Sequence, residues 1–234
     1  MNKFKKIIEC LKNPDLYKSY FYGVAPMFEL MPLLKKISNI STLVDVGSNK
    51  GQFGVIARKF FPGIRIHSFE PQEDQLNIQK KILGDYNIKY YNIALGNDEK
   101  TTKIYITKRK DSSSLLKPAN TTNEKYLVNA TKIINLQKLN NIAILKKIEG
   151  PSVLKLDVQG FELETLKGGD QIIDNFDYII IEVSFVKIYE NQVYANELYD
   201  FLNAKSFKLE AKCNFTMLDG KSFQEDLLFV KKKD

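Results

Sequence analysis

The chain has 234 residues and a mass of 27.0 kDa, and 44% of its residues are hydrophobic. These values are typical of one globular domain with a full-sized core, and they exclude a disordered or fibrous chain. The net charge is +7 and the isoelectric point is about 9.1, but only three of the 35 basic residues are arginines. Because phosphate and base recognition favours arginine, the lysine excess indicates compositional bias and argues against nucleic-acid binding.

The two cysteines, Cys10 and Cys213, have no neighbouring cysteine or histidine of the kind that zinc sites and redox motifs require. The first residues lack the apolar core of a signal peptide. No uncharged apolar stretch approaches the roughly 18–20 residues of a membrane helix. We therefore expect a cytoplasmic protein whose membrane contact is at most peripheral, and the sequence leaves a homo-oligomer open.

Residues 1–40 are expected to form a helical appendage, and residues 41–234 the main domain. Hydrophobic periodicity and turn residues predict strands over residues 42–46, 64–69, 88–95, 102–107, 152–158, 178–183, 206–209, 214–218 and 227–230. They predict helices over residues 52–61, 73–83, 161–173 and 197–204. A polar loop over residues 108–125 is expected to act as a lid, and residues 131–148 are ambiguous.

This alternation of strands and helices predicts an α/β fold with an open, doubly wound, mostly parallel sheet. A turn at Asp219-Gly220 indicates an antiparallel ending, with one reversed edge strand.

A glycine-rich turn follows the first predicted strand of the main domain. Its glycines, Gly47, Gly51 and Gly54, are spaced G-x-x-x-G-x-x-G. This differs from the G-x-G-x-x-G loop that binds dinucleotides, and the segment lacks the G-K-[ST] ending of a P-loop. The turn therefore favours a ligand without a phosphate, such as S-adenosylmethionine, at the carboxyl ends of the strands.

Each part of S-adenosylmethionine has an expected partner. Asp45 attracts the ammonium group, directly or through water, and Gly47 lets the backbone approach the amino-acid portion. Amides after Gly51 bind the carboxylate, and Glu70, which ends the second strand, accepts both ribose hydroxyls. The predicted cofactor-binding residues are Asp45, Gly47, Ser48, Asn49, Gly51, Glu70, Pro71, Asn92, Ala94, Leu95 and Asp157, with adenine near Asn92, Ala94 and Leu95. Taken singly, the glycines also fit a purely geometric role, and Asp45 a helix-capping role.

Five segments carry a family resemblance: residues 44–51, 69–71, 92–96, 154–162 and 166–168. Together they resemble the FkbM family of S-adenosylmethionine-dependent methyltransferases over about Thr42 to Val230. The resemblance implies a Rossmann-like, seven-stranded class I methyltransferase fold. It also implies O-methylation, commonly of a sugar or another hydroxyl-bearing natural product, as in polysaccharide biosynthesis. Ser48 stands where many members carry alanine, a change expected to leave cofactor binding intact.

Asp157 is the predicted general base, because it lies at a strand end and shares a strand face with Lys155. Three other roles stay open for Asp157: a buried pair with Lys155, a helix cap, and orientation of the methionine part of the cofactor. His67, the sole histidine, lies inside the second strand, and we interpret it as structural.

The acceptor is expected to meet residues outside the glycine loop. Glu182 ends the strand at 178–183 and is a predicted catalytic residue with Asp157 and Lys155, because a buried carboxylate needs a partner. The predicted acceptor contacts are Ser113, Glu162, Phe185 and Tyr189. Asp157 and Glu182 would suit Mg²⁺, but paired carboxylates on adjacent strands are common, so no metal is predicted.

Two other functions are alternatives for this sequence. A nucleic-acid methyltransferase would account for the net charge, but the chain lacks an Asn/Asp-Pro-Pro-aromatic motif and a Cys-Pro pair. A non-catalytic cofactor-binding module would keep the fold without the chemistry.

Overall fold

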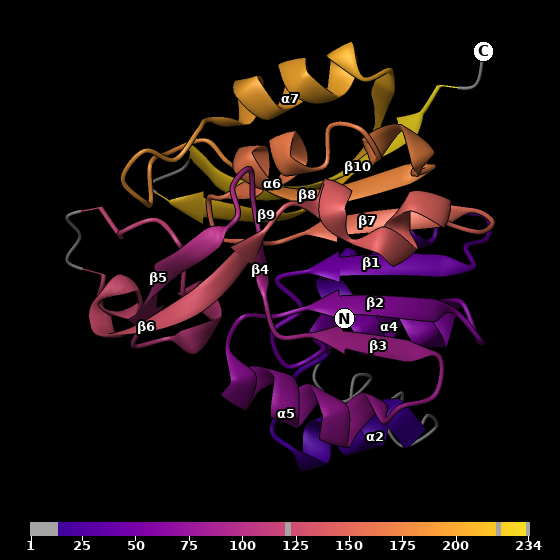
Figure 1. Cartoon of the computed structure of the whole chain (residues 1–234), viewed down its shortest axis with the longest axis horizontal. Coiled ribbons are helices and arrows are strands. Elements are labelled where there is room, and N and C mark those ends of the chain that lie inside the picture. The colour runs from indigo at the N-terminus through magenta and orange to yellow at the C-terminus, as the bar shows by residue number, and fades with distance from the viewer. Residues whose placement is uncertain (1–13, 120–122, 219–220, 233–234) are drawn as a thin grey trace.

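The computed structural model describes residues 14–119, 123–218 and 221–232, which form a three-layer α/β structure around a seven-stranded sheet (Figure 1). The strand order is β3-β2-β1-β7-β8-β10-β9. The strands are β1 (Thr42–Val46), β2 (Arg65–Phe69), β3 (Ile88–Tyr91), β7 (Ser152–Leu156), β8 (Tyr178–Ser184), β9 (Phe207–Leu218) and β10 (Lys221–Lys231). The first five of these strands run parallel to one another, as a doubly wound sheet requires.

Helices cover both faces of this sheet because its strands are apolar on both sides. In β1, Leu43 packs into one core cluster while Val44 and Val46 pack into the other. The helices α2 (Pro14–Phe21), α3 (Met31–Leu34), α4 (Gln52–Phe60) and α5 (Glu73–Leu83) supply the first cluster, and α6 (Glu162–Gly168) and α7 (Ala195–Ala204) supply the second. The alternation of side chains along each strand therefore builds two cores.

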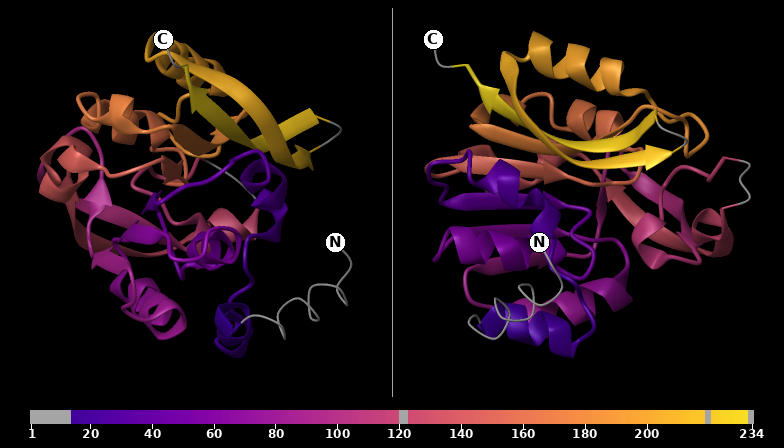
Figure 2. Two further views of the ribbon diagram at one scale, coloured as in Figure 1. Left: turned by 90° about the vertical axis from the view of Figure 1, so that its right-hand side faces the viewer. Right: turned by 180° about the vertical axis from the view of Figure 1, so that it is seen from behind.

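The C-terminal strands β9 and β10 form a long twisted hairpin at one edge of the sheet (Figure 2). The antiparallel ending is present, but its place differs from the prediction. The reversed strand β10 pairs with both β8 and β9, so β9 is the edge strand. The predicted strands at 206–209 and 214–218 are one continuous strand, and the predicted turn at Asp219-Gly220 lies outside the described residues.

A second, three-stranded sheet stands beside the main one, in the order β4-β6-β5. Its strands are β4 (Ala94–Leu95), β5 (Lys100–Thr107) and β6 (Val128–Gln137). The prediction of a single strand over 88–95 was wrong because the chain leaves the main sheet after Tyr91. The Asn92 side chain donates hydrogen bonds to the carbonyls of Glu70 and Pro71, and Ala94 then pairs with β6.

The predicted helix over 161–173 ends early, at Gly168. This glycine packs directly on the turn after β4: a Cβ at position 168 would lie 1.9 Å from the carbonyl oxygen of Gly96. A second glycine follows at 169, and paired glycines do not sustain a helix. Short 3-10 helices occupy Phe28–Leu30, Lys110–Ser112, Glu124–Tyr126, Leu139–Asn141, Ala143–Lys147 and Ile173–Asn175.

The described part of the N-terminal segment, residues 14–40, packs against the main domain. Leu16, Leu30, Leu33 and Leu34 are buried in the first core cluster.

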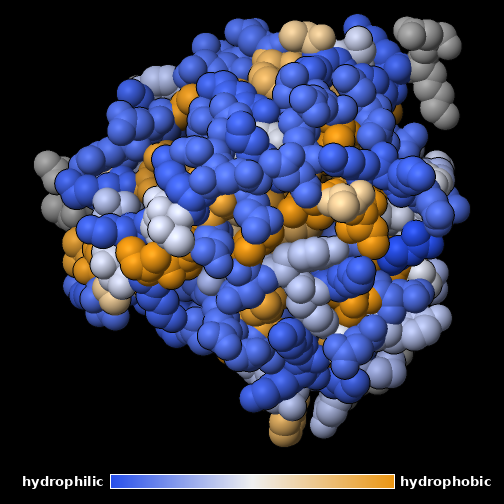
Figure 3. Space-filling view, in the orientation of Figure 1, coloured by the Kyte–Doolittle hydropathy of each residue, from blue (hydrophilic) through white to orange (hydrophobic). Residues whose placement is uncertain are grey.

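The face in Figure 3 is mostly hydrophilic, with its apolar side chains in separate patches. In the described residues, no helix has both the length and the apolarity needed to cross a bilayer.

Candidate active site

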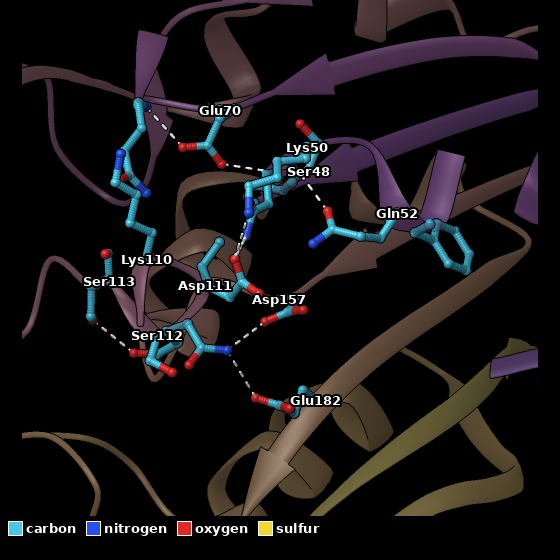
Figure 4. A pocket seen from close by; sticks show the side chains of 18 of the residues that line it. Ser48, Lys50, Gln52, Glu70, Lys110, Asp111, Ser112, Ser113, Asp157 and Glu182 are labelled. Carbon is cyan, nitrogen blue, oxygen red and sulfur yellow. Dashed lines mark hydrogen bonds and ion pairs between the residues drawn. The ribbon is translucent and has the colours of Figure 1, made fainter. Parts of the chain in front are cut away.

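A cavity of about 550 Å³ opens at the carboxyl ends of β1, β2, β7 and β8 (Figure 4). The segment from Gly23 to Glu29 lines one part of it, and the segment from Arg109 to Leu115, which follows β5, lines another. Parallel sheets place their ligands at this end because the loops that follow the strands converge there. The cavity therefore lies where the glycine loop predicts a ligand.

The glycine loop is held tightly between its two neighbouring strands. The amides of Gly47 and Ser48 donate to the carbonyl of Phe69 at 3.0 and 3.1 Å. Gly47 has a φ of 73°, and a Cβ there would lie 2.0 Å from the carbonyl oxygen of Asp157. Only glycine fits this position, because the backbone turns left-handed and the adjacent strand end fills the space of a side chain.

Glu70 lies on the cavity wall as a buried carboxylate held by backbone donors. The amides of Asn49 and Gln72 donate to its two oxygens at 2.9 and 2.8 Å. Burial raises the pKa of Glu70 to about 7, and the two amide hydrogen bonds lower it in part. The carboxylate keeps free lone pairs, so it has the capacity to accept two hydroxyl groups.

The buried polar atoms that lack partners at this end of the cavity are acceptors. Asn49 Oδ1 and Gln72 Oε1 have no hydrogen-bond partner within the described part of the chain, and both residues line the cavity. S-adenosylmethionine supplies donors of the required kind through its ammonium, ribose hydroxyls and adenine amine. Because buried acceptors are seldom left unpaired, these atoms together with the Gly47 turn fit that cofactor.

Asp45 lies beneath the cavity and does not line it. Its carboxylate is fully buried, and its nearest charged partner is the buried Lys155 ammonium at 3.7 Å. β1 and β7 place these two residues opposite each other. Burial raises the pKa of Asp45 to about 6, although Lys155 opposes this. The contact between Asp45 and the cofactor ammonium, direct or through water, stays a prediction; of these two residues, the structure places Lys155 and not Asp45 in the cavity lining.

The positive charge of Lys155 lies among three acidic side chains, Asp45, Asp157 and Asp226. Its ammonium is 3.3 Å from Asp157 Oδ2 as well as 3.7 Å from Asp45. Burial lowers the pKa of Lys155, but the charges of Asp157, Asp45 and Asp226 outweigh burial and raise it overall. Lys155 therefore stays protonated. It neutralises part of the negative charge of four neighbouring acids, Asp45, Asp157, Glu182 and Asp226, which we call the acidic floor.

Asp157 and Glu182 face the cavity (Figure 4), and the side chain of Gln159 joins them. The Gln159 side-chain amide donates to Asp157 Oδ1 at 2.7 Å and to Glu182 Oε2 at 3.3 Å. Gln224 also donates to Glu182 Oε2, at 2.7 Å. Burial raises the pKa of Glu182 well above its usual range, with Asp157 and Asp226 adding to the rise. A proton on Glu182 relieves the repulsion between two nearby carboxylates.

Gln159 was missed by sequence reasoning although it stands within the 154–162 motif. Its amide oxygen is 2.9 Å from the Tyr189 hydroxyl, which is also 2.8 Å from the carbonyl oxygen of Ser112. Its φ of 55° is unusual for a residue other than glycine, and strained backbone of this kind is concentrated at functional sites. The signal available was the Gly160 that follows it in the turn after β7.

Two further residues hold the segments around the cavity. Ser48 lines the cavity, and its hydroxyl accepts a hydrogen bond from the Ser68 hydroxyl at 2.7 Å. This bond anchors the glycine loop on β2. Ser113 also lines it, and its hydroxyl accepts from the Thr107 amide at 3.3 Å. The 108–125 segment thus lies over the cavity through its described residues; residues 120–122 are outside them.

The predicted site residues divide into two groups. Those that line the cavity are Gly47, Ser48, Asn49, Glu70, Pro71, Ala94, Leu95, Ser113, Lys155, Asp157 and Glu182. Those that do not are Asp45, Gly51, Asn92, Glu162, Phe185 and Tyr189. Gly51 is the N-terminal cap of α4, and Asn92 binds the backbone of the Glu70 turn.

The predicted acceptor contacts beyond Ser113 have other partners. Glu162 is buried and accepts from the amides of Val158 and Gly160, both at 3.1 Å, so it shapes the turn after β7. Tyr189 is buried behind that turn, and its hydroxyl donates to Gln159 and to the carbonyl of Ser112, which both line the cavity. Phe185 lines a separate surface hollow with Tyr194 and Tyr199. Backbone amides thus satisfy Glu162, and Gln159 with the Ser112 carbonyl satisfies the Tyr189 hydroxyl, so neither side chain lines the cavity.

His67 is buried inside β2, and its ring nitrogen is 3.3 Å from the Tyr91 hydroxyl. In the described residues, no group of three or more histidine, cysteine or acidic side chains is arranged to hold a metal ion.

Comparison with solved structures supports the fold. A TehB-like S-adenosylmethionine-dependent methyltransferase from Corynebacterium glutamicum aligns over 99% of this chain and 100% of its own, with a TM-score of 0.50 and 11% identity. A putative methyltransferase of the same cofactor class from Listeria monocytogenes aligns over 88% of this chain and 98% of its own, with a TM-score of 0.54 and 10% identity. No curated protein matches the sequence.

The model of the methyltransferase FkbM domain family matches residues 45–215, which cover the glycine loop, the Glu70 turn and the Asp157 segment. This chain therefore belongs to the FkbM family of S-adenosylmethionine-dependent methyltransferases.

Proposed function

We propose that this methyltransferase acts on a hydroxyl oxygen of a sugar, a glycan or another polyhydroxylated small molecule. The observation that carries the proposal is the position of Asp157, whose carboxylate faces the cavity while its backbone packs against Gly47 of the glycine loop. One residue thus joins the cofactor end of the cavity to the acidic floor. Glu182, Gln224 and Asn214 line that floor and offer several hydrogen-bonding groups to hydroxyls.

In this proposal, one end of the cavity binds the cofactor and the other end binds the acceptor. At one end, Glu70, Asn49 and Gln72 would bind the ribose and adenine of S-adenosylmethionine, which supplies an electrophilic methyl group when bound. Asp157 would orient the acceptor hydroxyl and take its proton as the new bond forms. Lys155, at 3.3 Å from Asp157, would hold that carboxylate in place for the task, and the segment after β5, which lines the cavity, would help to exclude water.

Replacing Asp157 with asparagine tests this assignment. We expect methyl transfer from radiolabelled S-adenosylmethionine to fall by about 100-fold or more, because general-base catalysis contributes roughly 10²–10⁴-fold. The assay would screen polysaccharide precursors and locate the new ether by mass analysis of the product. Calorimetry with S-adenosylhomocysteine should show affinity within a few-fold of the unmodified enzyme. If the variant loses cofactor affinity and keeps its turnover at saturation, Asp157 is a cofactor-binding residue instead.

Cofactor affinity is expected to depend on pH through Glu70. Its pKa is about 7 in the protein without ligand, so a rise in pH from 6 to 8 converts it to the carboxylate that accepts ribose hydroxyls best. S-adenosylhomocysteine should therefore bind more weakly at pH 6 than at pH 8, by up to about 10-fold. The Glu70→Gln variant should bind weakly at both values. If the affinity of the Glu70→Gln variant changes with pH as much as that of the unmodified enzyme, another group is responsible for the pH dependence.

A further inference from the structure

Five basic side chains line the cavity in the described part of the chain, and three of them, Lys50, Lys110 and Lys155, lie within 3.7 Å of an aspartate. Arg109 and Lys125 line the side formed by the small sheet, whereas the carboxylates of Asp157 and Glu182 lie on the main-sheet side. Arg109 follows β5 and Lys125 precedes β6, and the Arg109 amide donates to the Lys125 carbonyl at 3.3 Å. The pairing of these two chain segments therefore places both cations on the same wall.

Lys125 is held at the wall without an acidic partner. Its half-buried ammonium lies 4.5 Å from the centre of the Tyr126 ring and 5.7 Å from that of Phe223. No carboxylate forms an ion pair with it in the described ranges. Burial lowers the pKa of Lys125 and the charge of Arg109 lowers it further, while the charge of Glu182 opposes this in part. The Tyr126 and Phe223 rings thus position the Lys125 ammonium, and the positive charge of Arg109 repels it.

Arg109 is only weakly neutralised. Its guanidinium is 3.9 Å from Asp111, and that carboxylate is shared with Lys50 at 3.6 Å and with the Asn49 amide at 3.1 Å. Neighbouring Lys110 differs, because Asp74 binds it directly at 2.6 Å. Like charges that are only partly neutralised repel each other, and an anion bound between them removes that repulsion.

We propose that the acceptor carries an anionic group, a phosphate ester or a carboxylate, which Arg109 and Lys125 bind while its hydroxyl faces Asp157. This inference rests on the proposed function, because it describes the substrate of the same site. The two walls would orient such an acceptor in one direction: its hydroxyls would face Asp157 and Glu182, and Arg109 and Lys125 would donate hydrogen bonds to its anionic group. A neutral sugar would lack the second anchor.

The experiment uses the full chain saturated with S-adenosylhomocysteine and titrates it with glucose 1-phosphate, glucuronate and glucose by calorimetry. We expect one or both anionic sugars to bind and glucose to bind at least about 10-fold more weakly, as the loss of a charge-assisted hydrogen bond predicts. Binding of the phosphate alone identifies a phosphate-bearing acceptor, and binding of glucuronate alone a uronate.

Two variants and a matched control locate the anion. Arg109→Ala and Lys125→Gln should each weaken binding of the anionic sugar by at least about 10-fold. The control pair Lys103→Ala and Lys108→Ala removes the same number of charges from the same sheet at exposed residues that do not line the cavity, and it should bind the anion normally. Thermal melting of each variant confirms that it is folded.

The inference is overturned if neither anionic sugar binds at millimolar concentration, or if the control pair loses as much affinity as the two variants. It is also overturned if the variants weaken S-adenosylhomocysteine itself, since the cations would then serve the cofactor. Failure of the unmodified chain to bind S-adenosylhomocysteine would instead refute the proposed function, so the two failures are distinguishable.

Discussion

Replacing Gly47 with alanine is expected to lower cofactor affinity by about 100-fold or more and to destabilise the fold, because the new methyl group has no space. It would lie 2.0 Å from the carbonyl oxygen of Asp157, far inside contact distance. The left-handed backbone adds roughly 1–2 kcal/mol of strain. To relieve the clash, the ends of β1 and β7 must separate, which moves Asp157 away from the glycine loop. A displacement of about 1 Å in such a site costs on the order of 10²-fold in reaction rate, so methyl transfer should fall as well.

The matched control is Gly63→Ala. Gly63 has a similar φ of 83°, but nothing lies within 4 Å of a Cβ placed there. This variant should therefore show the backbone strain alone, with unchanged affinity for S-adenosylhomocysteine. Calorimetry and urea denaturation of both variants separate the clash from the strain. Equal behaviour of the two variants would mean that the contact between Gly47 and Asp157 has no role in cofactor binding.

The Lys155→Met variant is expected to lose about 3–5 kcal/mol of unfolding free energy near pH 8, the usual result of removing one partner from a buried ion pair. Methionine keeps most of the side-chain volume, so the loss reports the charge. Without the ammonium, Asp45 and Asp157 remain close together in a buried site, beside Glu182 and Asp226.

The loss should shrink as the pH falls. The pKa of Asp45 is about 6 in the folded chain, above its ordinary value of 3.8, so the folded state holds this proton more tightly than the unfolded state does. Ionisation of Asp45 between these values therefore costs stability as the pH rises. Removing Lys155 increases that cost, and protonation near pH 5 relieves it. The variant should thus be closer to the unmodified protein at pH 5 than at pH 8.

Two comparisons make this measurement decisive. Lys167→Met removes a lysine from a partly exposed pair with Glu164, and it should change stability by at most about 0.5 kcal/mol. The double variant Asp45→Asn and Lys155→Met should recover part of the loss, because it removes one of the uncompensated acids. If Lys155→Met is no more destabilising than Lys167→Met at pH 8, Lys155 does not neutralise the acidic floor.

Elements with strong local signals were predicted closely. The strand over 42–46 and the helix over 73–83 have the predicted bounds in the structure, where they are β1 and α5. Both have a regular apolar pattern with clear turn residues at their ends. The 88–95 strand was predicted less well, because the departure of the chain after Tyr91 depends on pairing with β6, more than 30 residues away. Long-range pairing of this kind leaves little trace in a local pattern.

The sequence by itself determined the family, the parallel α/β arrangement and the location of the glycine loop at the end of the first strand of the sheet. Only the tertiary structure decided which of the polar side chains face the cavity. Asp45 and Glu162 are acids near strand ends like Asp157, yet the fold encloses Asp45 completely beneath the cavity, and backbone amides satisfy Glu162. Gln159 reaches both cavity carboxylates. The physical reason is that a buried polar group points to the partner that satisfies it, and folding alone brings that partner within reach.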